Sequence, residues 1–570
     1  MKNLIEKITE NKMKIIECIP NFSEGRDTAL IKEITDAMES VSGITLLDVD
    51  PGADTNRTVV TIVGSPESVI EAAFLAIKKS SELIDMRNHS GAHARMGATD
   101  VCPFVPISET SMDDCVTYSK QLAKRVGEEL NIPVFLYEFS ATNNDRINLA
   151  NIRSGEFEGM ADKLQIPQWK PDYGPAKPHA TAGVTAIGAR NFLIAYNLNL
   201  NTKDKKIATD IALDIREQGR NKRDKYGKFI RDENGFPIKV PGILKSCKAV
   251  GWYIEEYGLA QVSMNLTNFN ETPPHIAFEE TRNQARKRGV RVSGSELVGL
   301  IPLESMIAAG KYFLTKQKRS TGIPVQDIIH IAVKSMGLDD LAPFDPNEKI
   351  IEYRIGKRFN TLASMTLHDF SDELSSDSPA PGGGSVAALA GALGASLTSM
   401  VANLTFGKKK WEPLFKQMSQ LAEKSQQLKD ELIQLIDSDT ESFKLVMEAF
   451  KLPNNSDQQK TERDSAIDSA MKEATNIPFQ TLKCCRDIMD LALEAAKYGN
   501  PNSVSDAGVG GEMANSGARG AALNVRINLK DIDDELFCKK METDTEIILS
   551  ETYALLIEIR ETVEAKLING

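Results

Sequence analysis

The fold of the first half of the chain is decided by three short runs rich in β-branched residues, IIECIP (15–20), GITLLDVD (43–50) and TVVTIVG (58–64). Two more runs of the same kind follow, DVCPFVPI (100–107) and IPVFLYE (132–138). Runs of this length and composition predict β-strands. Longer segments with helical periodicity separate them, at 28–40, 66–84 and 111–130. This alternation predicts an α/β domain with a layered sheet.

The alternation begins again at NFLIAYNLNL (191–200) and predicts a second α/β subdomain. Its expected helices cover 203–218 and 275–288, and its further strands include 249–256 and 259–268. Residues 216–248 hold ten Lys or Arg against four acids. We expect a solvated surface loop or hairpin there, with an anion site as the alternative. The β-branched alternation ends with EKIIEYRI (348–355).

The rest of the chain, residues 366–570, is dominated by Ala, Leu, Met and Glu. This composition predicts an all-α helical bundle domain. We therefore divide the chain into four parts: an N-terminal α/β subdomain (1–190), a C-terminal α/β subdomain (191–355), a linker (356–365) and a helical domain (366–570).

The overall composition is that of an ordinary globular protein and excludes several classes of function. Of 570 residues, 41% are hydrophobic and 26% charged, so about two to four folded units are expected. The net charge of −12 argues against a nucleic-acid partner. Seven irregularly spaced cysteines suggest a reducing compartment, and the N-terminus lacks the apolar core of a secretory signal. We therefore expect a cytoplasmic protein.

One stretch, SVAALAGALGASLTSMVANL (385–404), is long enough to cross a membrane. Because Ala, Gly, Ser and Asn dilute it, we favour a tightly packed soluble helix and expect no membrane partner. Gly391 and Gly394 in this helix should allow a close approach to the small-residue segment 507–522.

The helix begins with three glycines and a serine, where free backbone N–H groups can hold an anion. No GK[ST] sequence follows, which disfavours a nucleotide loop.

The loop MRNHSGAHARMGATD (86–100) concentrates two histidines and two arginines between a helix and a strand. His89 and His93 are four residues apart, but Gly91 separates them and no acidic ligand accompanies them on a helix, so we expect no metal there. A histidine in such a loop serves either structure or proton transfer. From the residues alone both roles remain open.

In the helical half, the segment 414–450 carries apolar residues at steps of three and four. Asp439 occupies this apolar seam, four residues from both Leu435 and Phe443, whereas Asp437 lies off the seam and is expected in solvent. Burying an unpaired carboxylate is costly, so an acid on the seam needs a reason. A catalytic role and a buried ion pair are equal alternatives from the pattern.

Several specific strings in the sequence resemble the formimidoyltransferase-cyclodeaminase family, the bifunctional folate enzymes of histidine degradation. The strings are ECIPNFSEGRD (17–27), LLDVDPGADTNRTV (46–59), LIDMRNHSGAHARMGATDVCPFVP (83–106), DYGP (172–175), GARNFLIAYN (188–197), REQGR (216–220) and GWYIEE (251–256). The resemblance covers nearly the whole chain. It implies that His93 is the acid/base of formimidoyl transfer, that His89 is its noncatalytic neighbour, and that Asp439 is the cyclodeaminase aspartate.

The chemistry that the resemblance implies makes further residues candidates for substrate contacts. A developing amidinium favours a nearby carboxylate, for which Asp50 is the candidate, with capping of the Pro51 turn as the alternative. Asn56 and Arg57 are candidates for binding substrate carboxylates. We expect folate contacts in two segments: Gly174, Pro175, Ala176, Lys177, Pro178, His179, Ala180, Thr181, Ala182 and Gly183, and then Gly382, Gly383, Gly384 and Ser385.

The resemblance therefore implies two enzyme activities, one in each half of the chain. The first half would transfer a formimidoyl group between N-formimidoyl-L-glutamate and tetrahydrofolate, and the helical half would cyclise 5-formimidoyltetrahydrofolate to 5,10-methenyltetrahydrofolate with loss of ammonia. The alternative is a glutamate formyltransferase with a helical folate-binding assembly domain of little activity. We expect tetrahydrofolate as a polyglutamylated co-substrate, no metal, and a homo-oligomer.

Overall fold

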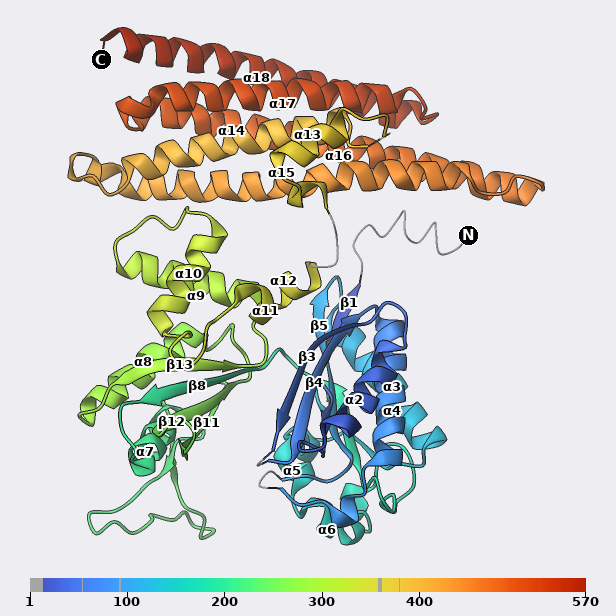
Figure 1. Cartoon of the computed structure of the whole chain (residues 1–570), viewed down its shortest axis with the longest axis vertical. Helices are drawn as coiled ribbons and strands as arrows, with labels where there is room; N and C mark the ends of the chain where they lie inside the picture. The colour runs from blue at the N-terminus through green and yellow to red at the C-terminus, as the bar shows by residue number, and fades with distance from the viewer. Residues whose placement is uncertain (1–13, 54, 92–93, 357–360, 379, 570) are drawn as a thin grey trace. The chain divides into compact units, whose positions relative to one another are not determined.

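The computed structural model describes residues 14–53, 55–91, 94–356, 361–378 and 380–569. These residues form two compact units, each of which can be followed in Figure 1. The α/β unit extends to Ala309 and resumes at Met336, and the helical unit comprises Gly310–Ser335 and the chain after the 357–360 segment. The predicted fold class, α/β followed by all-α, is confirmed.

The first sheet of the α/β unit has seven strands. In its centre, β1 (Ile15–Cys18) and β2 (Asn21–Phe22) pair antiparallel with β4 (Arg57–Gly64) on one side and with β5 (Thr99–Ser108) on the other. β3 (Thr45–Gly52) pairs with β4. On the other side, β5 is followed by the parallel strands β7 (Thr185–Ala189) and β6 (Val134–Glu138). The five predicted strands are confirmed, and β2 and β7 are additional.

Three helices supply apolar side chains to one face of this sheet: α2 (Thr28–Glu39), α3 (Pro66–Leu83) and α4 (Met112–Glu129). Helix α3 begins with a proline at its first position, and α4 begins with a capping box between Ser111 and Asp114. The strand residues in this core include Ile16 and Cys18. Because side chains alternate along a strand, Glu17 lies on the opposite face.

A second, smaller core contains the short helices α5 (Leu149–Arg153) and α6 (Glu156–Lys163). It includes Val101 and Phe135 from the strands. At its side, the fully buried Asp100 accepts a hydrogen bond from the Met96 N–H and pairs with Arg153. This packing fixes the backbone at the start of β5.

The second sheet has four antiparallel strands in the order β11 (Cys247–Ile254), β12 (Leu259–Leu266), β8 (Ile194–Leu200) and β13 (Val292–Val298). Helices α7 (Lys205–Ile215) and α8 (Pro274–Lys287) pack on this sheet. The predicted second α/β subdomain is thus present. Across neighbouring strands, the Gln261 amide donates to Asn199 and to Glu296.

The basic segment between α7 and β11 is largely exposed. It contains a short antiparallel pair, β9 (Arg220–Asn221) with β10 (Lys239–Val240). Beyond this pair, three residues spaced by eight bond in a closed cycle: the N–H of Lys222 donates to Ile238, that of Ile238 to Ile230, and that of Ile230 to Lys222. The segment is therefore a surface hairpin that closes on itself.

The segment 348–355 is not a continuation of the β-branched alternation. It belongs to two short helices, α11 (Pro346–Lys349) and α12 (Ile351–Gly356), and α11 starts at a proline capped by Asp345. Two longer helices precede them, α9 (Leu303–Lys316) and α10 (Val325–Met336). The backbone N–H of Leu303 donates to Glu352, which ties α12 to the start of α9.

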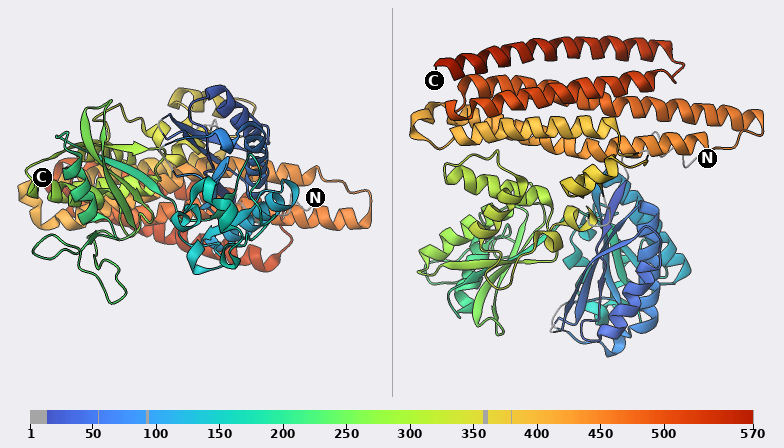
Figure 2. Two further views of the ribbon diagram at one scale, coloured as in Figure 1. Left: turned by 90° about the horizontal axis from the view of Figure 1, so that it is seen from below. Right: turned by 45° about the horizontal axis from the view of Figure 1, so that its top comes forward.

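The helical unit is built around five long helices that run alongside one another in both views of Figure 2. They are α14 (Gly383–Thr405), α15 (Phe415–Phe450), α16 (Asp457–Tyr498), α17 (Val504–Leu529) and α18 (Glu535–Asn569). The short α13 (Leu367–Leu374) precedes them. By length and composition α14 qualifies as a membrane span, but most of it is buried in this bundle.

Helices α14 and α17 meet as closely as their small residues predict. A Cβ atom on Gly394 would lie 2.7 Å from the carbonyl oxygen of Gly510, and one on Gly517 would lie 2.8 Å from that of Ala387. Gly391 differs from the prediction, because its missing side chain makes room for Cys485 of α16 and Leu432 of α15. Both glycines permit close packing, but against different helices.

Two residues of the predicted seam on α15 are exposed, Phe443 at 41% and Phe450 at 47%. Ile436 and Thr440 are buried instead. An α-helix turns 3.6 residues per turn and not 3.5, so a seam drawn at heptad spacing drifts around a helix of 36 residues.

Candidate functional site

The predicted transferase loop lies between α3 and β5, and it begins with a short 3-10 turn at Met86–Asn88. His93 lies outside the described residues, so its predicted role stays a prediction. Gly91 passes so close to Thr55 that a Cβ atom at this position would overlap the Thr55 carbonyl. The loop is therefore packed against the β3–β4 turn.

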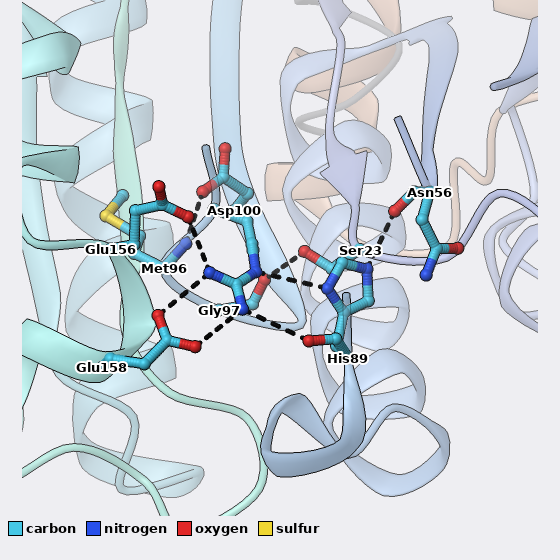
Figure 3. A network of polar contacts seen from close by, with 9 residues as sticks. Ser23, Asn56, His89, Met96, Gly97, Asp100, Glu156 and Glu158 are labelled. Atoms are coloured by element: carbon cyan, nitrogen blue, oxygen red, sulfur yellow. Dashed lines mark hydrogen bonds and ion pairs between the residues drawn. The ribbon is translucent and has the colours of Figure 1, made fainter. Parts of the chain in front are cut away.

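His89 is held through both of its ring nitrogens, as Figure 3 shows. Its Nε2 lies 2.9 Å from the carbonyl oxygen of Asn56, and Arg95 Nε lies 3.4 Å from its Nδ1. Since arginine only donates, Nδ1 is the acceptor and Nε2 carries the hydrogen. His89 thus bridges Asn56 and Arg95, and both of its ring nitrogens are engaged.

Arg95 connects His89 to helix α6 (Figure 3). Its guanidinium donates to the His89 carbonyl and pairs with Glu156 at 2.6 Å and Glu158 at 2.7 Å. Both acids lie in the first turn of α6, where negative charge is favoured. The two ion pairs of the Arg95 guanidinium therefore fix the end of the loop on α6.

Asn56, a predicted substrate ligand, uses its side-chain amide within the protein. Its Oδ1 accepts from the Gly25 N–H and its Nδ2 donates to the Ser90 carbonyl, each at 3.0 Å. The residue is buried and adopts a positive φ of 49°, which asparagine tolerates better than most residues. Asn56 thus ties the 86–100 loop to the loop after β2.

Arg57 lies at the start of β4 among three other charged groups. The pKa of Arg57 is lowered to about 10, mainly by burial and also by the neighbouring Arg153, while Asp100 and Asp50 act in the opposite direction. Asp50 is exposed near the end of β3. The structure therefore brings Asp50 and Arg57 into one electrostatic cluster, and Asp100 and Arg153 are members that the sequence did not indicate.

The predicted folate segment 174–183 lies next to the histidine loop. The Thr181 carbonyl accepts from the Met86 N–H at 2.9 Å. His179 and Gly183 exchange two backbone hydrogen bonds, and His179 Nδ1 accepts from the Ala182 N–H. The residues from Gly174 to Lys177 are exposed. One half of the segment is thus anchored, and the other half faces solvent.

In the helical unit the predicted acid and the predicted glycine segment form one cluster. The Asp439 Oδ2 accepts from the backbone N–H of Ser385 at 3.0 Å and lies 3.2 Å from the Ser385 hydroxyl. Burial raises the pKa of Asp439, and the contacts with Ser385 act in the opposite direction. The hydrogen-bond acceptor at this helix start is therefore a side chain of the protein itself.

Asp437 is not free in solvent, contrary to the sequence prediction. It is half-buried and accepts the backbone N–H of Leu362 at 2.6 Å. This bond attaches the 3-10 turn Leu362–Ser364 to α15, a contact that the helical pattern does not reveal.

A third helix, α17, places Asn524 beside Gly383. A Cβ atom on Gly383 would lie 3.2 Å from the Asn524 Nδ2, which donates to the Gly520 carbonyl of its own helix. The sequence indicated α17 only as a small-residue packing surface. The one signal for Asn524 was a polar side chain among these small residues.

Glu17 is a further buried carboxyl that the sequence did not single out. It is 1% exposed, and its Oε2 has no hydrogen-bond partner among the described residues. The pKa of Glu17 is raised to about 8, mainly by burial; Arg190 acts to lower it and Glu352 to raise it. Within the described residues no group of three His, Cys, Asp or Glu side chains could hold a metal ion.

Family models match three successive regions of the chain. The formiminotransferase domain, N-terminal subdomain, matches residues 15–190, the formiminotransferase domain matches 195–356, and the model described as formiminotransferase-cyclodeaminase matches 366–546. The two α/β subdomains and the helical bundle therefore define a transferase region followed by a cyclodeaminase region.

Similarity to whole proteins agrees with this class. A formimidoyltransferase-cyclodeaminase of Dictyostelium discoideum is 43% identical over 552 residues, which cover 96% of this chain and 98% of the relative. The chain belongs to the formimidoyltransferase-cyclodeaminase family.

Two shorter relatives match one half each. A glutamate formimidoyltransferase of Streptococcus pyogenes serotype M1 is 48% identical over 301 residues, covering 53% of this chain and 93% of the relative. A methenyltetrahydrofolate cyclohydrolase of Methylorubrum extorquens is 44% identical over 201 residues, covering 35% of this chain and 97% of the relative.

Proposed function

We propose that the two activities of this bifunctional formimidoyltransferase-cyclodeaminase are carried by different residues, His93 in the α/β unit and Asp439 in the helical unit. The first activity transfers the formimidoyl group between N-formimidoyl-L-glutamate and tetrahydrofolate. The second cyclises 5-formimidoyltetrahydrofolate to 5,10-methenyltetrahydrofolate and releases ammonia. The observation that carries the proposal is the Asp439 carboxyl, which is half-buried and bonded to the first turn of α14.

In the transfer step, an amine attacks an amidine carbon, and a proton must move from the incoming to the departing nitrogen. His93 is the proposed carrier of this proton. The engagement of both His89 ring nitrogens supports the choice between the two histidines. Arg57 is proposed to bind a substrate carboxylate, and Asp50 to favour the amidinium charge.

In the cyclodeaminase step, N10 of the folate attacks the formimidoyl carbon, the C=N π bond breaks, the N10 proton passes to the imine nitrogen, and a tetrahedral aminal with an amino group forms. The Asp439 carboxyl donates its proton to the amino group, the carbon–nitrogen bond breaks and ammonia leaves. The product is the methenyl cation, and the Asp439 carboxylate remains to balance its charge. The raised pKa of Asp439 supports this role, because a carboxyl must be protonated to act as an acid.

Folate is proposed to bind through 174–183 in the first unit and Gly382–Ser385 in the second, and to carry a polyglutamate tail. The contact between Thr181 and Met86 supports the first assignment, because it places the segment beside the histidine loop. Neither proposed step needs a metal ion, since proton transfer and charge pairing are supplied by side chains.

A second candidate activity is hydrolysis of 5,10-methenyltetrahydrofolate to a formyl folate. The Methylorubrum relative, named a methenyltetrahydrofolate cyclohydrolase, favours it. Addition of water to the methenyl carbon uses the same site in the reverse sense, with water in place of ammonia. Incubating the full chain with 5,10-methenyltetrahydrofolate, without an ammonia source, tests this activity through the loss of methenyl absorbance above the spontaneous rate.

We also propose that the protein assembles with copies of itself. Helix α14 exposes apolar side chains at heptad-like spacing, and α17 exposes a similar row. These residues are Val386, Leu393, Met400 and Leu404 on α14, and Val509, Leu523 and Ile527 on α17. Sedimentation of wild type and Leu393→Glu tests the assembly, and an unchanged mass in the variant would remove this face from the interface.

We also propose that the protein is located in the cytoplasm. All seven cysteines lie in the described part of the chain and are free thiols. Free thiols are typical of a reducing compartment. Cell fractionation of the native protein tests the location.

The central experiment follows both products with the intact chain. Formimidoylglutamate and tetrahydrofolate are supplied, and the loss of the donor, the appearance of methenyltetrahydrofolate and the release of ammonia are measured together. Formylglutamate replaces the donor in a parallel reaction. Equal use of both donors without ammonia release would favour the formyltransferase alternative.

A further inference from the structure

Ser385 lies in the first turn of α14, where backbone N–H groups have no partner within the helix. The first helical hydrogen bond in this turn runs from the Val386 N–H to the Gly382 carbonyl. The N–H of Ser385 is therefore free to bond elsewhere, and it donates to the Asp439 Oδ2 at 3.0 Å. Ser385 is fully buried, so this bond is shielded from water.

The hydroxyl of Ser385 faces two acceptors. It lies 2.9 Å from the carbonyl oxygen of Ile436 and 3.2 Å from the Asp439 Oδ2. A hydroxyl carries one hydrogen and donates to one of the two acceptors at a time. A carboxylate is a stronger acceptor than a neutral carboxyl or a peptide carbonyl. The charge of Asp439 therefore decides which of the two acceptors receives the hydroxyl hydrogen of Ser385.

The other carboxyl oxygen has different surroundings. A Cβ atom on Gly384 would overlap the Asp439 Oδ1 and lie 2.6 Å from Oδ2, so the glycine makes room for the whole carboxyl group. Neither of the Ser385 donors is directed at Oδ1, since both contacts are to Oδ2. The serine thus holds one of the two oxygens that the glycine admits.

We infer that Ser385 is the positioning residue of the cyclodeaminase acid: it holds Oδ2 of Asp439, leaves Oδ1 to carry the transferred proton, and turns its hydroxyl from Ile436 to Oδ2 as the carboxylate forms. This inference rests on the proposed role of Asp439. In the step itself, the Oδ1–H bond breaks, a nitrogen–hydrogen bond forms on the departing amine, and the carbon–nitrogen bond breaks. Ser385 exchanges only its hydrogen-bond acceptor.

Ser385 is the residue whose contacts stabilise the carboxylate form of Asp439. Burial raises the pKa of Asp439, and both contacts with Ser385 lower it, with no charged side chain among the causes. Helix α14 itself contains no charged residue. On α15 the nearest acids along the chain are Asp437 and Glu441. Loss of the hydroxyl therefore leaves the new carboxylate with one donor fewer and makes Asp439 a weaker acid.

The test uses the full chain with 5-formimidoyltetrahydrofolate supplied, and it compares Ser385→Ala, Ser385→Thr and Asp439→Asn. We expect Ser385→Ala to lower kcat about tenfold or more, separately from any rise in KM that loss of the proposed folate contact causes, and to move the loss of activity at high pH to a higher pH. Ser385→Thr, which keeps the hydroxyl, should restore most of the rate. Ser396→Ala is the matched control, because Ser396 lies on the same helix and bonds only to its own Ala392 carbonyl.

The outcomes separate the inference from the function on which it rests. If Asp439→Asn is inactive while Ser385→Ala keeps the wild-type kcat and pH profile, the inference is overturned and the acid remains. A rise in KM alone in Ser385→Ala would show a substrate-binding serine and also overturn it. If folded Asp439→Asn keeps full activity, the proposed catalytic role of Asp439 and the proposed positioning role of Ser385 are both wrong.

Discussion

The carbonyl oxygen of Gly510 lies 2.7 Å from the point where a Cβ atom on Gly394 would stand. Two helices, α14 and α17, meet there backbone to backbone, so the contact has no flexible side chain that could yield.

Gly394→Ala should destabilise the helical unit by about 1–3 kcal/mol, because the added methyl group overpacks a backbone contact. Gly508→Ala on α17 is the matched control, since a Cβ atom there first meets the Val563 side chain at 3.3 Å. The control should be close to neutral, because alanine favours a helix more than glycine does. Chemical denaturation of both variants measures the difference, and equal stabilities would refute the close contact.

His93→Ala should lower formimidoyl transfer by about 10²-fold or more, because it removes the proposed proton carrier. Cyclodeamination of supplied 5-formimidoyltetrahydrofolate should be unchanged. Steady-state assays of the two reactions on the same preparation provide the measurement. Unchanged transfer in a folded His93→Ala protein would end the assignment.

His89→Ala should mainly cost stability, about 1–3 kcal/mol, because it leaves the Asn56 carbonyl and Arg95 without this partner. Transfer should fall less than in His93→Ala. Thermal unfolding measured beside the transfer rate distinguishes the two effects. A loss of transfer as large as that of His93→Ala, in a protein of normal stability, would show that His89 takes part in the chemistry.

Asp439→Asn should abolish cyclodeamination while the stability of the protein stays equal or rises. No ion pair involves Asp439 among the described residues, so the change leaves no cation unpaired and removes the cost of a buried carboxylate. Transfer should persist and 5-formimidoyltetrahydrofolate should accumulate. Glu441→Gln, on an exposed turn of the same helix, is the control; Asp437 is less suitable because it bonds to Leu362. A strong loss of stability in Asp439→Asn would instead indicate a structural carboxyl.

Glu17 should make the α/β unit less stable as the pH rises. Its pKa is about 8 in the folded protein, above the ordinary value of 4.5, so the unfolded chain loses this proton first. The free energy of unfolding should therefore fall between about pH 4.5 and pH 8, by at most roughly 5 kcal/mol from this group. Glu17→Gln should flatten this dependence, whereas the exposed Glu128→Gln should not. Denaturation curves at several pH values measure the slope, and parallel slopes for Glu17→Gln and wild type would contradict the prediction.

The parts of the fold that could be predicted are those set by local pattern. The strands around IIECIP and TVVTIVG were predictable because short runs rich in β-branched residues favour a strand. The two helices at 346–356 were not, because EKIIEYRI has the composition of a strand while Asp345 and Pro346 start a helix there. Tertiary contacts outweigh propensity in so short a segment.

The candidate sites show the same division. Asp439 was predictable because a carboxyl on an apolar seam is a local anomaly. Its attachment to Ser385 was not, because the two residues are 54 positions apart in the sequence. Glu17 lies in a strand whose neighbours on either side are apolar, and only the assembled sheet shows that its carboxyl is buried. The exposure of Phe443 depends on the exact twist of a long helix, which the residue types do not fix.

The closed cycle of hydrogen bonds among Lys222, Ile230 and Ile238 has a practical meaning. The hairpin satisfies these backbone groups by itself, and its β9 and β10 pair forms a two-stranded sheet separate from the second sheet. Its order is therefore independent of the sheet's core, and a shorter turn between Asn221 and Lys239 would leave that core intact. The segment is therefore an exposed attachment point for a dye or an affinity handle.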